Sequence, residues 1–329
     1  MSNIAIGANT FSNVKFGNSQ VKGVYLGDNL VWTNFKYMLD LYPTNVHHAY
    51  SLRKLRNLYG GFCLRIRRTT TLPTVTTTTA DLSFDTNLNA ITINSNIVYV
   101  SGTATAATTL EQFALGTVDG FTASNINVVT WYDQSGNGKN VTNTLVSQQP
   151  RLWNSLNGLE KSGGYAAVRF TRATSTNLKI ADTTANINNM SSYFVGAFVV
   201  SSALGGVGYS LGDATNRFYF PFTAGANVYA AYSATTTAII LQTGFNLSRH
   251  LYELISPTVG STTLIQGFAD GVAKGTFGIV SASTAQIVIG NAGGGANFYD
   301  GFVQEVIGYQ SNSNRIEKET NINDYWTIF

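Results

Sequence analysis

One short stretch carries residue types that could hold a cation. Asp133, Ser135 and Asn137 stand at alternate positions and a glycine follows, as in the first half of an EF-hand calcium loop. The twelfth position of such a loop is Thr144, where a bidentate Glu is required. The alternative is that these side chains bond nearby backbone amides and brace a glycine-rich loop. We therefore predict a structural loop and no metal, formed by Asp133, Ser135, Gly136, Asn137 and Gly138.

Other chemical groupings are weak. The lone Cys63 excludes an internal disulfide and is expected to be a buried thiol, while His47, His48 and His250 show no zinc spacing. No Ser-His-Asp set and no phosphate loop can be identified, so no cofactor is expected. Six cations lie between Arg53 and Arg68, but they come from a predicted helix face and a predicted strand face, and no aromatic residues are interleaved with the cations of either face. With a net charge of only +3, nucleic acid is not a predicted partner.

The elements that must position these residues are mostly strands. Only 11% of the 329 residues are charged and 44% are hydrophobic, with many Thr, Asn and Gly, which is typical of an all-β protein rich in turns. The run 128–131 predicts a buried strand before the central loop. Further strand patterns at 8–12-residue spacing predict a sandwich, at 166–170, 193–200, 208–211, 217–222, 227–233, 239–241, 249–256, 262–269, 275–277, 285–289 and 301–309.

Turns and helices punctuate these strands. Asp270-Gly271 predicts a hairpin turn. Residues 44–59 predict a helix ended by Gly60-Gly61, and 109–113 predict one helical turn. A closing helix is expected after Asn314, which would form a capping pair with Glu317. Its apolar face should pack on the sandwich through Ile322, Tyr325, Trp326 and Phe329.

Three segments carry a resemblance to a known family. They are Trp131–Gly138, Gln149–Leu152 and Ala167–Phe170. Together they resemble the concanavalin A-like catalytic domain of fungal arabinofuranosidase B, and still more its divergent copies in tailed-phage virion proteins, which are similar to laminin-G-type lectin domains. The resemblance covers roughly residues 45–329 and implies a jelly-roll sandwich.

The resemblance also implies where a hydrolase would hold its two carboxylates. The resembled nucleophile Glu follows a Gly-Asn-Ala-type turn, which matches 212–216 here, and no Glu stands there. The resembled acid is an Asp in a Gly-rich loop, which matches 289–295, where Asn291 stands instead. A slip of the alignment would bring in Asp213 or Asp300. Since both groups are missing, we predict that the chain is not an enzyme, with no catalytic residues.

A lectin role fits the same cleft. Aromatic platforms with a few polar groups bind sugars. The resemblance places six candidate glycan-binding residues at the cleft, although the aromatic ones among them are also compatible with core or sheet-surface positions: Tyr209, Arg217, Tyr219, Asn291, Asn297 and Tyr299.

The N-terminal region predicts a separate unit. Short alternating runs at 4–6, 14–16, 21–26 and 30–32 are divided by turns, and so small a sheet needs a partner surface. Residues 24–32 resemble a module that begins many phage structural proteins, which implies docking or trimer formation. The docking residues would be Tyr25, Leu26, Leu30 and Trp32, in a module of residues 1–36 before a jelly-roll domain of residues 37–329. An edge hairpin of the main domain is the alternative.

These observations lead to one leading hypothesis and two alternatives. The leading one is a non-enzymatic tailed-phage virion protein, in a fibre, tail or head decoration, that docks to other virion proteins, forms a homo-oligomer such as a trimer, and displays a surface for glycans. The alternatives are an arabinofuranosidase-type glycoside hydrolase and a soluble carbohydrate-binding protein. No signal peptide and no membrane span are predicted. The resemblance to phage proteins implies that the expected location is the virion, with the protein made in the host cytoplasm.

Overall fold

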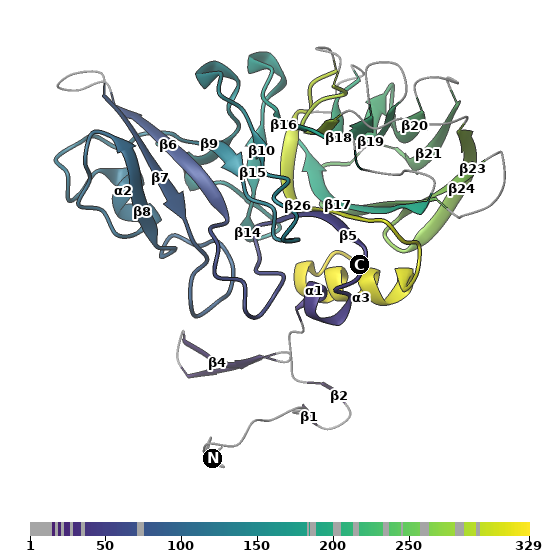
Figure 1. Cartoon of the computed structure of the whole chain (residues 1–329), viewed down its shortest axis with the longest axis horizontal. Helices are drawn as coiled ribbons and strands as arrows, with labels where there is room; N and C mark the ends of the chain where they lie inside the picture. The colour runs from purple at the N-terminus through teal and green to yellow at the C-terminus, as the bar shows by residue number, and fades with distance from the viewer. Residues whose placement is uncertain are drawn as a thin grey trace.

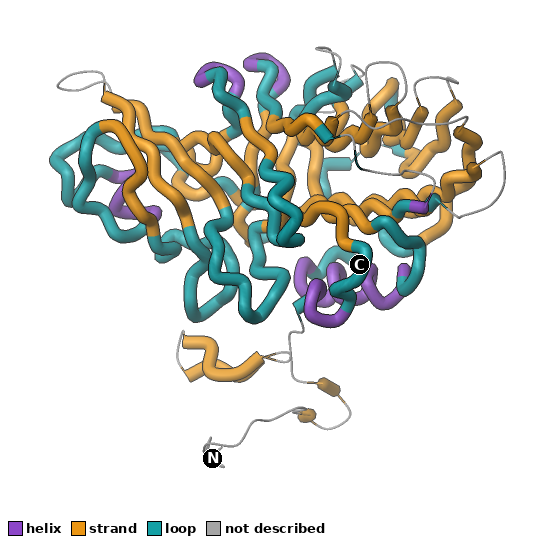
Figure 2. Tube along the Cα trace, in the orientation of Figure 1, coloured by secondary structure: helices purple, strands orange, loops and turns teal. Residues whose placement is uncertain are grey.

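A computed structural model gives the fold of the chain. It describes residues 15–16, 19–20, 23–26, 29–33, 37–70, 76–182, 184, 189–199, 205–212, 217–232, 237–244, 246–256, 263–279, 286–293 and 297–329. Strands dominate this part of the chain (Figure 2), and the strand ladders are antiparallel. The predicted all-β sandwich with short peripheral helices is confirmed.

The sandwich consists of two sheets, which Figure 1 shows one above the other on the right of the molecule. The first sheet runs in the order β10 (Val141–Thr142), β16 (Leu178–Ala181), β25 (Gln286–Ile289), β18 (Val207–Gly212), β19 (Arg217–Ala224), β20 (Asn227–Tyr232) and β21 (Thr237–Thr243). The second runs β26 (Gly301–Tyr309), β17 (Ser191–Phe198), β22 (His250–Ile255), β23 (Thr263–Ala269) and β24 (Val272–Ile279). On its other edge β26 pairs with β15 (Val168–Phe170) and with β5 (Val46–Ser51).

A third group of strands extends the sandwich on the left of Figure 1. It runs β8 (Ile97–Gly102), β7 (Thr76–Leu82), β6 (Leu64–Thr70) and β9 (Ile126–Trp131). Strand β9 pairs with β10 and with β11 (Arg151–Asn154), which in turn pairs with β15, so it connects both sheets. The remaining short elements are β12 (Gly158–Leu159), β13 (Lys161–Ser162), β14 (Tyr165–Ala166), and the 3-10 turns Val146–Gln148 and Arg172–Thr174.

The core lies between the two sheets of the sandwich and is rich in aromatic rings. Phe194 of β17 meets Phe220 of β19 at 6.5 Å between ring centroids and Tyr299 at 5.9 Å. Both Phe194 and Tyr299 are fully buried. Because such edge-to-face pairs add to the burial of apolar area, these rings hold the facing sheets together.

The predicted helix over 44–59 is wrong. Residues 46–51 form strand β5, which pairs with β26 along its length. Leu52 and Leu55 are three residues apart, as on one face of a helix, but they lie in the bend that follows the strand, where both side chains are buried. In that bend the Leu52 amide donates to the Gln304 carbonyl, while the Leu55 carbonyl accepts from the Leu39 amide.

Three helices lie outside the sheets: α1 (Met38–Leu41), α2 (Leu110–Leu115) and α3 (Arg315–Trp326). The predicted closing helix is confirmed as α3, which lies with α1 below the second sheet and buries Ile322 and Trp326 (Figure 1). The prediction that Phe329 packs on the same face is wrong, because the helix ends at Trp326 and Phe329 is 55% exposed. Its predicted capping pair is wrong, because Asn314 has a φ of 56° and its side chain makes no capping hydrogen bond. Within the described residues, no helix is long and apolar enough to cross a membrane.

The N-terminal strands pair with one another. Strand β1 (Lys15–Phe16) pairs with β2 (Ser19–Gln20), and β3 (Gly23–Leu26) pairs with β4 (Asn29–Thr33), where Tyr25 faces Leu30 in the register. Leu26 and Trp32 belong to the same hairpin. The predicted strand over 4–6 lies outside the described residues.

Candidate functional site

An aromatic ladder occupies the outer face of β19 and β20. Phe218 and Phe220 point into the core, whereas Tyr219, Phe222 and Tyr229 are half-buried on the opposite face. The ring centroids of Tyr219 and Phe222 are 5.0 Å apart, and those of Phe222 and Tyr229 are 5.3 Å apart. A register shift between β19 and β20 brings the three rings together, because it places Tyr229 directly opposite Phe222. The result is a continuous apolar strip with phenol groups at its edges.

The ladder continues toward the edge of the sheet. Ile240 of β21 lies opposite Tyr229 and is 42% exposed. The Asn227 side-chain amide donates to the Tyr229 hydroxyl at 3.2 Å, which fixes the ring's polar end. Aromatic faces stack on the C–H side of sugars, while amides and hydroxyls bond their hydroxyl groups. The face therefore has the composition of a sugar platform.

A folded turn forms one side of this platform. The Ser210 hydroxyl on β18 donates to the Asn291 carbonyl at 2.9 Å, which fastens the turn to the outer face of the sheet. The Asn291 side chain accepts from the Gly293 amide at 2.8 Å, and Gln286 donates to the Gly293 carbonyl at 3.1 Å. A Cβ on Gly293, whose φ is 78°, would lie 3.6 Å from Nη1 of Arg217. The turn therefore lies against Arg217 at the start of β19.

The outer face carries little charge. Among the described residues of β18, β19, β20 and β21, Arg217 is the one charged side chain, and none is a carboxylate. Burial raises the pKa of the Tyr219 phenol, although the neighbouring Arg217 acts in the opposite direction. Tyr219 therefore stays a neutral hydroxyl that can both donate and accept hydrogen bonds.

The structure divides the six predicted glycan residues. Arg217 and Tyr219 lie on the outer face, and Asn291 shapes the turn beside it. Tyr209 and Tyr299 are fully buried, so they present no surface to a sugar. The sixth, exposed Asn297, lies just before Tyr299 and accepts from the Val207 amide through its carbonyl.

Sequence reasoning missed two rings of the ladder, Phe222 and Tyr229. Their signal was present, because both fall within runs that predict strands. What the sequence could not supply was the face to which each ring points.

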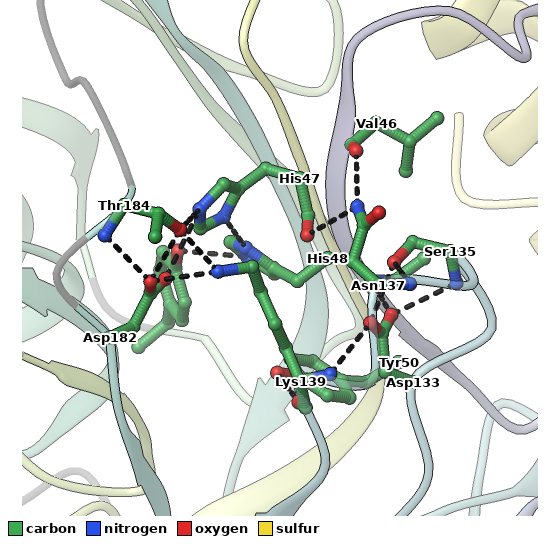
Figure 3. Close-up of polar contacts among 12 residues, drawn as sticks. Val46, His47, His48, Tyr50, Asp133, Ser135, Asn137, Lys139, Asp182 and Thr184 are labelled. Atoms are coloured by element: carbon green, nitrogen blue, oxygen red, sulfur yellow. Dashed lines mark hydrogen bonds and ion pairs between the residues drawn. The ribbon is translucent and has the colours of Figure 1, made fainter.

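The central loop after β9 is built around Asp133, whose two oxygens accept four hydrogen bonds (Figure 3). Oδ1 accepts from the amides of Ala49 at 2.8 Å and Ser135 at 2.9 Å. Oδ2 accepts from the Ser135 hydroxyl at 2.6 Å and the Lys139 amide at 3.1 Å. The side-chain nitrogen Nδ2 of Asn137 donates to the Val46 carbonyl at 2.7 Å. These bonds hold the loop against the start of β5.

The loop glycines have the backbone conformations that the turn needs. Gly136 has a φ of 92° and Gly138 a φ of 70°. An L-residue adopts such angles only with strain.

As for a cation, no group of three His, Cys, Asp or Glu side chains that could hold a metal occurs in the part of the chain that the structure describes.

Three of the six cations of 53–68 form ion pairs within the protein. Arg53 is fully buried against Glu305, with 2.6 Å between Nε and Oε2. Arg65 pairs with Asp81, and Arg68 pairs with Asp119, both at 2.9 Å. Because their hydrogen-bonding groups are directed at protein carboxylates, these three side chains do not present a cationic surface.

Comparisons with known proteins place the fold. No family model matches the chain, and no curated protein sequence matches it. Among solved structures it is similar to a GH54 α-L-arabinofuranosidase soaked with a cyclic sulfate inhibitor, with a TM-score of 0.52, 12% identity and 89% of the chain covered. It is also similar to an arabinofuranosidase complexed with arabinofuranosyl-α-1,2-xylobiose, with a TM-score of 0.50, 15% identity and 87% covered. The chain spans only 66% and 64% of those two proteins.

These comparisons correct one prediction. The prediction from two missing carboxylates that the chain is not an enzyme is contradicted, because the two solved structures just described, which share its fold over 89% and 87% of its length, are arabinofuranosidases. No comparison supports the tailed-phage part of the resemblance. At 12% and 15% identity the likeness shows the fold alone, which the chain shares with 66% and 64% of the length of these two arabinofuranosidases.

Proposed function

We propose that the chain binds neutral glycans on the outer face of β19, β20 and β21. The observation that carries this proposal is the ladder of Tyr219, Phe222 and Tyr229, with Ile240 extending it toward the sheet edge. A strip of rings beside hydroxyl and amide groups matches the two sides of a sugar ring. Since the described strands of this face hold no carboxylate and one cation, an uncharged saccharide fits better than a polyanion.

Binding to a polysaccharide panel tests the proposal. Arabinose-decorated xylan is the first probe, because one fold neighbour is complexed with arabinofuranosyl-α-1,2-xylobiose. Polygalacturonate serves as the charged comparison. Phe222→Ala and Tyr229→Ala should each weaken binding about tenfold, equivalent to about 1.4 kcal/mol. Tyr99→Ala is the matched control, since Tyr99 is 44% exposed on the distant strand β8. Equal losses in all three variants, or no binding to any neutral glycan, would refute the proposal.

Hydrolysis of an arabinofuranoside is a second candidate, favoured by the fold that the chain shares with arabinofuranosidases. Of the two carboxylates that a shifted alignment would supply, Asp213 lies outside the described residues. Asp300 is half-buried and forms an ion pair with Arg169 at 2.5 Å. Release of arabinose from decorated xylan would establish the activity. If Asp213→Asn and Asp300→Asn each leave release unchanged, neither residue is catalytic.

We also propose that residues 1–36 dock the chain to a partner, as in a virion particle with a homo-oligomeric component. Support comes from β3 and β4, which pair with each other in a short hairpin. A chain lacking residues 1–36 should fold with unchanged thermal stability and unchanged glycan binding, but should sediment as a smaller species. If the shortened chain keeps the sedimentation of the full chain, association resides in the sandwich.

A further inference from the structure

A series of hydrogen bonds connects three segments beside the central loop (Figure 3). Two adjacent histidines at the start of β5 form its middle, with 2.8 Å between Nδ1 of His47 and Nδ1 of His48. On one side, Nε2 of His47 lies 3.1 Å from Oδ2 of Asp182, just after β16. On the other side, Nε2 of His48 lies 3.0 Å from the hydroxyl oxygen of Tyr209 on β18.

The hydrogen-bonded series from Asp182 to Tyr209 is shielded from water. His48 and Tyr209 are fully buried, and His47 is 5% exposed. The ring of His48 stacks on Tyr50 at 5.5 Å. Gly308 on β26 leaves space for His48, since a Cβ there would lie 2.3 Å from Cε1 of the ring.

Asp182, at the outer end of this hydrogen-bonded series, is held by charged and polar contacts. The Lys139 ammonium donates to Oδ1 of Asp182 at 2.7 Å, and the Thr184 amide donates to the same oxygen at 2.9 Å. Burial by itself raises the pKa of Asp182, but hydrogen bonds from His47, Lys139 and Thr184 outweigh it and hold the pKa well below its usual range. Asp182 is therefore ionised at neutral pH and accepts hydrogen bonds.

When neither histidine is charged, the ionised Asp182 determines which ring nitrogens carry hydrogens. Nε2 of His47 must carry a hydrogen in order to donate to the carboxylate, so its Nδ1 is bare. The hydrogen between the two rings must then sit on Nδ1 of His48. Burial, and next the neighbouring His47, lower the pKa of His48 well below its usual value, so His48 is neutral and its Nε2 accepts from the Tyr209 hydroxyl.

Adding one proton to His47 reverses the donor and acceptor roles between the two rings and between His48 and Tyr209. Both nitrogens of His47 then carry hydrogens, and Nδ1 becomes the donor to His48. Two N–H groups cannot face each other at 2.8 Å, so Nδ1 of His48 must be bare. A neutral His48 then carries its hydrogen on Nε2 and donates to the Tyr209 oxygen, and the Tyr209 hydroxyl turns its own hydrogen to Ser192. Each hydrogen bond of the chain is kept in both states, the bound protons differ by one, and the positive charge lies beside Asp182.

We propose that His47 and His48 form a one-proton switch in which protonation of His47 forces His48 from its Nδ1–H to its Nε2–H tautomer. The groups facing the pair are Asp182, Lys139 and Thr184 at the outer end, and Tyr50 and Tyr209 at the inner end. The switch links the proton concentration to the contact between the start of β5 and the end of β16, because the charge on His47 strengthens its bond to Asp182.

Two-bond proton–nitrogen NMR spectra of the full chain, labelled with nitrogen-15 in histidine, test this switch. Such spectra distinguish the two neutral tautomers and the charged ring. As the pH falls, His47 should become charged and His48 should change from Nδ1–H to Nε2–H at the same midpoint. His250, which bonds Asp270 at 2.6 Å on β22, is the internal reference. If His48 keeps one tautomer through the His47 transition, or becomes charged itself, the proposal is wrong.

Tyr209→Phe provides the matched perturbation, because it keeps the ring and removes only the hydroxyl. Nε2 of His48 then lacks its partner in both protonation states, so each state loses one hydrogen bond, and His48 should still change tautomer at the midpoint of the His47 transition. Loss of the tautomer change in a folded variant would show that Tyr209, and not His47, sets the tautomer of His48, and would overturn the proposal. If the variant does not fold, the tautomer measurement on the natural chain still decides the question.

Discussion

The ion pair between Arg53 and Glu305 gives the sharpest stability prediction. Both side chains are fully buried, and they form two hydrogen bonds, at 2.6 Å from Nε and 3.0 Å from Nη2. The Ser51 hydroxyl also donates to Glu305, and Arg53 reaches Asn321 on α3 at 3.1 Å. Removing one partner leaves a buried charge uncompensated, so Glu305→Met or Arg53→Met should each lower the free energy of unfolding by about 3–5 kcal/mol.

The double variant separates pairing from burial. With both charges replaced by Met, no buried charge remains, and the loss should be smaller than that of either single variant. Urea unfolding followed by tryptophan fluorescence measures all three. Glu160→Gln is the control, because the Arg151–Glu160 pair has a similar distance of 2.6 Å but is partly exposed, and should cost at most about 1 kcal/mol. Losses in the double variant that equal the sum of the two single losses would refute the reasoning.

Three further predictions concern single positions. Burial and the adjacent Glu319 raise the pKa of Glu253 to about 9. The free energy of unfolding should therefore fall as the pH rises from about 4.5 to 9, by at most about 6 kcal/mol, because the unfolded chain releases this proton first. Glu253→Gln should reduce the difference in stability that urea titrations measure between pH 5 and pH 9. Asp133→Asn replaces one of the two carboxylate oxygens, which together accept four hydrogen bonds, with an NH₂ group. It should lower the free energy of unfolding by about 2 kcal/mol or more in the same assay, and an unchanged urea midpoint would show that these bonds do not stabilise the loop. Gly308→Ala forces a methyl group against His48 and should lower thermal stability by the equivalent of about 1–3 kcal/mol, whereas equal melting temperatures would show that the ring moves freely.

The sequence by itself determined the features that depend on local chemistry. Asp270 and Gly271, with φ of 49° and 75°, form the hairpin turn that the dipeptide predicts between β23 and β24. The spacing of Ile322 and Trp326 marks the buried face of α3. Turn residues and periodic apolar positions act over a few residues, so no distant contact is needed to recognise them.

Tertiary structure decided the rest. Strand β19 is aromatic on both faces, so its period of two shows that Tyr219 and Phe220 point to opposite sides but not which side meets water. Pairing with β26 likewise made 46–51 a strand, although the spacing around it favours a helix. Only the packing of the two sheets selected the ladder's face, and only the meeting of β5, β16 and β18 joined His47 and His48 to partners over a hundred residues away. Contacts of such long range depend on the whole fold, because local sequence carries no information about which distant segment will cover a given face.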